Sequence, residues 1–171
     1  MYSVKCPQCR GELVQPTSRC PACGSKIPLG LRFANRGFEW KSRTKLWRIP
    51  LVHIAWGFDE QGKLRIAKGI IAVGQFAVGL ITVAQFGVGI LFGFGQVMFG
   101  LAVLAQIAGG LLIAVGQLAA GVITVGQVVV GIYGLCQTGW AKYMWSPQRV
   151  DMEAVALYYT IMMRLRELVG L

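Results

Sequence analysis

The stretch GQFAVGLITVAQFGVG, residues 74–89, decides the fold, because a small residue recurs in it at every fifth position. The same spacing continues through an apolar block, residues 69–141, that contains no charged side chain. The small residues of the block are Gly69, Gly74, Gly79, Ala84, Gly89, Gly95, Gly100, Ala105, Gly110, Gly116, Gly121, Gly126, Gly131 and Cys136. The interval is five except at 89–95 and 110–116, where one residue is added, so a longer repeat runs from Gly74 to Gly95 and from Gly95 to Gly116.

An α-helix does not explain this spacing. Every fifth residue advances about 500° around a helix and therefore marks no face. The block contains sixteen glycines, and each would cost ~0.5–1 kcal/mol relative to alanine in a helix in water. Membrane helices tolerate glycine, so a polytopic helical membrane protein with about three spans of ~20 residues remains the alternative. Internal repetition at a short period is instead typical of a solenoid.

The segments GQFAV, AQFGV, GQLAA and GQVVV resemble the pentapeptide-repeat family, whose members are right-handed four-sided β-helices built on small-(Asp/Asn)-(Leu/Phe)-x-x. The resemblance implies a mainly β fold, a four-sided β-solenoid of roughly 20–21 residues per coil. It also implies that Gly74 and Phe76 point inward, whereas Gln75, Ala77 and Val78 point outward. This chain departs from the family in having glutamine or an aliphatic residue at the second position and apolar outward positions. The role of some members as acidic DNA mimics does not transfer to a chain of net charge +10.

The glutamines of the block follow the longer repeat. A four-sided coil would stack them in two columns on opposite sides, Gln75, Gln96 and Gln117 in one and Gln85, Gln106 and Gln127 in the other. Amides stacked at the strand spacing of ~4.8 Å can hydrogen-bond along the column. We therefore expect two structural amide ladders that fix the register of the coils.

The N-terminal segment CPQCRGELVQPTSRCPACGSK, residues 6–26, contains two Cys-Pro-x-Cys turns with the thiols of Cys6, Cys9, Cys20 and Cys23. Two such turns supply the tetrahedral four-sulfur shell that Zn²⁺ accepts. The pattern resembles a zinc ribbon over residues 4–26, and a rubredoxin-like iron site is the alternative. The start of the chain has no secretory signal, which favours a reducing cytoplasm and metal binding rather than disulfides. Four protein ligands leave no open position, so we expect a structural Zn²⁺ site.

The positive charge is concentrated next to the apolar block. Residues 1–68 carry 13 Lys/Arg and 4 Asp/Glu, whereas residues 142–171 carry 4 and 3. Aromatic and basic residues that border an apolar band are typical of a membrane interface, although they also suit the ends of a solenoid. The candidate lipid or anion contacts are Lys41, Arg43, Lys45, Arg48, Trp47, Trp140 and Trp145. A solvated face and a nucleic-acid surface are the alternatives, and the few basic and aromatic residues between Cys9 and Cys20 disfavour nucleic acid.

These patterns predict a zinc ribbon over residues 1–28, a basic linker over 29–44, a β-solenoid over 45–141 and a capping α-helix over 146–170. The outward-facing apolar residues need a cover, because soluble monomers rarely expose large apolar patches. We therefore expect a non-enzymatic scaffold that self-associates through its apolar faces and lies at the cytoplasmic side of a membrane. The single histidine, His53, has no partner ligand in view, and nothing suggests a small-molecule substrate. A zinc-ribbon nucleic-acid-binding protein is the remaining alternative.

Overall fold

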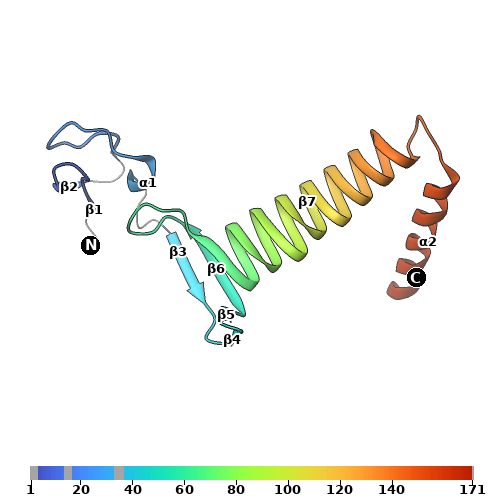
Figure 1. Cartoon of the computed structure of the whole chain (residues 1–171), viewed down its shortest axis with the longest axis horizontal. Coiled ribbons are helices and arrows are strands. Elements are labelled where there is room, and N and C mark those ends of the chain that lie inside the picture. Colours follow the sequence, from blue (N-terminus) through green and yellow to red (C-terminus); the bar gives the residue numbers. More distant parts are fainter. Residues whose placement is uncertain (1–3, 14–16, 33–36, 171) are drawn as a thin grey trace.

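The computed structural model describes residues 4–13, 17–32 and 37–170, and Figure 1 shows the chain. Parts of the expected ribbon and of the basic linker, residues 1–3, 14–16 and 33–36, lie outside the described residues. The fold is mainly β with a C-terminal helix, as predicted. Its elements are β1 (Val4–Lys5), β2 (Glu12–Leu13), α1 (Leu29–Arg32), β3 (Gly37–Lys41), β4 (Lys45–Leu46), β5 (Ile49–Pro50), β6 (Val52–Gly57), β7 (Ile66–Trp145) and α2 (Met152–Val169).

The 80 residues of β7 form one continuous extended segment that winds in successive turns along a single axis (Figure 1). The alternative of membrane helices over this block is therefore wrong. The regularly spaced small residues belong to an extended chain instead. Among the described residues, no helix is both long and apolar enough to cross a membrane.

Successive turns approach each other at a separation of ten or eleven positions along the chain. A Cβ atom added to Gly79 or to Gly87 would lie 2.5 Å from the carbonyl oxygen of the residue ten positions earlier, Gly69 or Ala77. At Gly95, an added Cβ would overlap the carbonyl oxygen of Ala84, eleven positions earlier. The predicted four-sided coil is thus wrong: one turn holds two five-residue segments, and the longer repeat spans two turns. Glycine is favoured at these positions because the backbone of the preceding turn approaches so closely.

The winding begins with β6, which pairs in parallel with β7 in the register Val52↔Ile71 to Ala55↔Gly74. A loop between β6 and β7 interrupts the repeat, and its ends are joined by a bridge between Phe58 and Leu64. β3 pairs antiparallel with the other edge of β6, so the three strands follow the order β3-β6-β7. The expected start of the solenoid at residue 45 falls instead on β4, which pairs only with β5 in a two-stranded hairpin.

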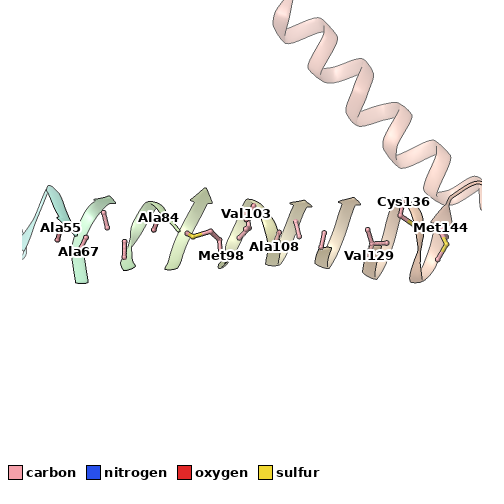
Figure 2. Close-up of a cluster of buried hydrophobic side chains, with 14 residues drawn as sticks. Ala55, Ala67, Ala84, Met98, Val103, Ala108, Val129, Cys136 and Met144 are labelled. Atoms are coloured by element: carbon pink, nitrogen blue, oxygen red, sulfur yellow. The ribbon is translucent and has the colours of Figure 1, made fainter. Parts of the chain in front are cut away.

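The interior of the winding is narrow, and the fourth residue of most five-residue segments fills it (Figure 2). Ala77 is 1% exposed, whereas Phe76 is 36% exposed and stacks outside on Phe86, with ring centroids 5.4 Å apart. The prediction that Phe76 points inward and Ala77 outward is therefore wrong. Two strands of one short turn face each other so closely that only small or slender side chains fit between them. The inward residues include Ala67, Ala72, Ala77, Thr82, Met98, Val103, Ala108, Ala114, Ala119, Thr124, Val129 and Met144.

Large inward side chains lie beside glycines. The end of the Met98 side chain would be 3.0 Å from a Cβ added to Gly93, and a methyl group of Val129 would be 2.8 Å from one added to Gly134. At these two places the absence of a glycine side chain leaves room for the larger side chain, as close packing requires. This pairing explains Gly93 and Gly134, which stand outside the five-residue spacing.

The glutamines share one edge of the winding. Gln75, Gln85 and Gln96 line one groove, and Gln117, Gln127 and Gln137 line another. The prediction of two columns on opposite sides is wrong, because a turn of only two segments brings every one of these glutamines to the same edge. All are exposed, and the only hydrogen bond to their side chains within the described residues joins the Gly57 amide to Oε1 of Gln75 at 3.4 Å. The amide ladder itself stays a prediction.

The helix α2 docks on the winding only by its first half. Asp151 precedes it, and its carboxylate accepts a hydrogen bond from the Met144 amide at 2.8 Å. Tyr158 is buried, and its hydroxyl lies 2.9 Å from the carbonyl oxygens of Thr124 and Tyr133. Burial raises the pKa of Tyr158 to about 12. Beyond this contact α2 leaves the winding (Figure 2), with Leu165 and Leu168 exposed.

Candidate metal centre and basic hairpin

Two backbone turns of the same design position the four cysteines. In each turn, the amide of the first cysteine donates to the carbonyl five residues later, from Cys6 to Gly11 and from Cys20 to Ser25, both at 2.9 Å. The carbonyl of the first cysteine accepts from the amide four residues later, at Arg10 and at Gly24. Those two residues have positive φ, 58° and 71°. The shared geometry follows from the shared Cys-Pro-x-Cys sequence, and it aims two thiols of each turn at one point.

The sulfur atoms are arranged as a metal site requires. Sγ of Cys6 lies 3.8 Å from Sγ of Cys23, and Sγ of Cys9 lies 3.6 Å from Sγ of Cys20. All four lie within 4.8 Å of one another. Sulfur atoms bound tetrahedrally at ~2.3 Å from one ion are about 3.8 Å apart. The predicted cluster of Cys6, Cys9, Cys20 and Cys23 is confirmed as a group that could hold a metal ion.

The pKa values of the thiols are shifted in different directions. The Ser25 hydroxyl, 3.5 Å from Sγ of Cys6, is the main cause that lowers the pKa of Cys6 to about 6. The same hydroxyl also lowers the pKa of Cys23. A backbone hydrogen bond at Gly11 favours the thiolate of Cys9, but the neighbouring Cys23 and Cys20 raise the pKa of Cys9 to about 12. Four adjacent thiolates repel one another, so a bound cation is what allows all of them to ionise.

The small core beneath this site consists of Cys6, Leu13, Cys20 and Ile27, with Leu31 of α1 packed against it. The first cysteine of each turn is buried and the second is exposed. So few apolar residues bury little surface, and a metal ion bound to the four thiols would therefore contribute much of the free energy that folds this region.

A second group of charged residues surrounds Glu39, where β3, β6 and β7 meet. Nζ of Lys41 lies 2.6 Å from the Glu39 carboxylate, which Arg65 also contacts. These cations, Lys41 foremost, lower the pKa of Glu39. His53 is 3% exposed; its Nδ1 accepts from the Lys68 amide at 2.7 Å, and its Nε2 lies 3.2 Å from Glu39. His53 thus joins two strands by hydrogen bonds.

The structure brings only some of the predicted lipid or anion contacts together. Lys41, Lys45 and Arg48 line one pocket with Lys68, and Trp47 forms the tip of the adjoining β4–β5 hairpin. Arg43 lies in the turn between β3 and β4, whereas Trp140 and Trp145 lie in the last turn of β7, at the opposite end of the winding (Figure 1).

Lys68 and Glu39 were not among the predicted site residues. Because a loop separates β6 from β7, the sequence does not show that the two are neighbouring turns. Only their pairing places Lys68 beside His53. The sequence offered one signal for this pairing: a loop is inserted between two segments that keep the same five-residue spacing.

Comparison with known proteins gave no match: no family model, no curated protein and no solved structure is similar to this chain.

Proposed function

We propose that the protein is a non-enzymatic scaffold at a membrane, built on a two-sided β-solenoid over β6 and β7. Copies of the chain would associate through the apolar outer faces of the solenoid, and the four-cysteine module would bind Zn²⁺ and serve as a structural or protein-contact unit. The cytoplasmic side of the membrane is the proposed location, since the thiols of such a module stay reduced there.

The observation that carries this proposal is the apolar exterior of β7. Large outward side chains are well exposed along its whole length, among them Phe76 (36%), Phe86 (43%), Leu91 (51%), Phe99 (55%), Leu112 (51%) and Val130 (47%). They form columns that run along the winding, because equivalent positions recur at every turn. Apolar surface of this extent marks a contact with protein or lipid.

Lipid around the winding is the second candidate, and its length favours it. The 80 residues of β7, at ten or eleven positions per turn, give between seven and eight turns. At a spacing of ~4.8 Å the winding is about 35 Å long, which is comparable to the ~30 Å hydrocarbon core of a bilayer. Trp56 lies at one end, 46% exposed, and Trp140 at the other, 76% exposed, as at membrane interfaces.

The test combines membrane fractionation of the full chain with its mass in mild detergent. We expect the protein in the membrane fraction and a mass of two or more chains. Ile107→Glu and Leu112→Glu, on the two outer faces, should lower the mass to one chain, whereas the matched Gln106→Glu at the glutamine edge should not. A monomer that needs no detergent would overturn the proposal. A monomer that enters the membrane would favour the lipid-embedded candidate instead.

A further inference from the structure

The turn that joins β4 to β5 has an unusual sequence for its backbone. The pairs Lys45↔Pro50 and Leu46↔Ile49 leave a two-residue loop, Trp47–Arg48. Both loop residues have positive φ, 47° and 73°. Such loops strongly prefer Asn-Gly, because bulky residues are strained in this conformation. The loop nevertheless carries a tryptophan, and Trp47 is 93% exposed, so its ring gains almost no packing against the described part of the chain. Strain without a packing benefit points to a function.

An apolar groove of about 690 Å³ lies beside this turn. The hairpin forms one wall with Leu46, Trp47 and Ile49, and the first turns of β7 form the other with Ile70, Leu80 and Ile90. Leu46 and Ile49 are 56% and 49% exposed. The groove therefore offers a solvent-exposed apolar surface that ends at the exposed tryptophan.

A basic pocket of about 510 Å³ adjoins the groove, because Arg48, Pro50 and Lys68 line both. Its cations are Lys41, Lys45, Arg48 and Lys68, and its one carboxylate is Glu39. Glu39 is already paired with Lys41 and Arg65. Over the ranges that the structure describes, the side chains of Lys45, Arg48 and Lys68 have no acidic partner. The pocket thus carries an excess of positive charge that an anion can neutralise.

We infer that this end of the molecule binds an anionic phospholipid at a bilayer surface. The phosphate lies in the basic pocket, an acyl chain follows the apolar groove, and Trp47 enters the interfacial region. A free phosphate ion would use only the pocket and would leave the groove and the tryptophan unexplained. Charge complementarity next to an apolar groove is the signature of an anionic amphiphile. The inference rests on the membrane location proposed above and gives it a chemical specificity.

The experiment measures binding of the full-length, metal-loaded chain to vesicles of phosphatidylcholine alone and to vesicles that also contain 30 mol% phosphatidylglycerol. We expect tighter binding to the anionic vesicles. Lys45→Gln, Arg48→Gln and Lys68→Gln together should lower that preference about a hundred-fold, since each cation near the surface contributes ~5-fold. The matched control removes the same charge elsewhere, with Lys63→Gln, Lys142→Gln and Arg164→Gln, and should keep most of the preference.

A second variant separates binding from folding. Trp47→Asn with Arg48→Gly gives the turn its preferred residues, so the protein should unfold at an equal or higher temperature while it binds anionic vesicles at least ten-fold more weakly. Unchanged binding by this variant, or equal losses in the triple variant and its control, would overturn the inference. So would displacement by millimolar inorganic phosphate, or tighter binding to a single-stranded RNA through the same cations.

The mass of each variant in mild detergent is measured in parallel. If wild-type protein is monomeric but prefers anionic vesicles, self-association fails and the lipid site stands. If the mass is that of an oligomer and no lipid preference is found, the scaffold proposal stands and the lipid site fails.

Discussion

The four-cysteine module and the winding of β7 both have a small cross-section that leaves little room for a buried core, and they are stabilised in opposite ways. The module has a core of four buried residues, two of which are cysteines of the candidate metal site. The winding has a narrow interior of mostly small side chains, but it repeats that interior over 80 residues. Stability is therefore concentrated at one point in the module and distributed over many equivalent turns in β7. The two regions should differ in what destroys them.

The largest effect expected is that of metal removal. A strong chelator, or Cys20→Ser, should unfold residues 4–32, because structural Zn²⁺ sites contribute ~10–16 kcal/mol of apparent binding free energy to folding. The winding should keep its β signal in circular dichroism, while the amide NMR signals of β1 and β2 move to the narrow chemical-shift range of an unfolded chain. Loss of both signals together would mean that the two regions fold as one unit, and survival of the module would show that its own core suffices.

Within the winding, a single added methyl group tests how tightly the turns approach. Gly95→Ala places a Cβ against the carbonyl oxygen of Ala84, and overpacking of this kind costs about 1–3 kcal/mol. Ala105 occupies the equivalent position in the next turn, and Ala105→Gly removes a Cβ there at a cost of only ~0.5–1 kcal/mol. Denaturant midpoints measure both. Equal midpoints for the two variants would contradict the close approach of successive turns.

Within the module, the two cysteine turns provide their own control. Arg10 has the positive φ that Gly24 has in the second turn. Arg10→Gly should stabilise the metal-bound module by up to ~1 kcal/mol, and Gly24→Ala should destabilise it by a similar amount. The thermal unfolding of the module measures the two changes. If both variants were destabilised, side-chain contacts of Arg10 would outweigh the backbone strain.

The smallest effect concerns the ion pairs where β3 meets the winding. The folded protein lowers the pKa of Glu39 below its ordinary value of 4.5, so the ionised carboxylate favours the folded state. This stability is complete above pH 4.5 and is lost as pH falls through the lower pKa of the folded state. Glu39→Gln should remove about 0.2–1 kcal/mol at neutral pH, as for partly exposed pairs. It should also flatten the decline in unfolding temperature between pH 5 and pH 3, and an unchanged pH profile would contradict this role.

The sequence predicted the cysteine cluster because the spacing of Cys6, Cys9, Cys20 and Cys23 admits few other arrangements. It also predicted an extended repeat, since glycine at every fifth position is incompatible with one face of a helix. The number of segments per turn was mispredicted, because two segments and four segments share the same phase and the same longer repeat. The glutamines carried a signal for the shorter turn, since one follows every second small residue from Gln75 onward.

The sequence by itself thus determined where the backbone must come close, because glycine or alanine at a fixed interval has a local steric meaning. It also determined where a metal can bind, since two matched turns present their thiols without help from the rest of the chain. Only the tertiary structure decided which side chains face inward and that the glutamines share one edge. It alone placed Lys68 beside the strained Trp47 turn. These features depend on which turns become neighbours, and that choice is made by contacts between residues far apart or separated by a loop.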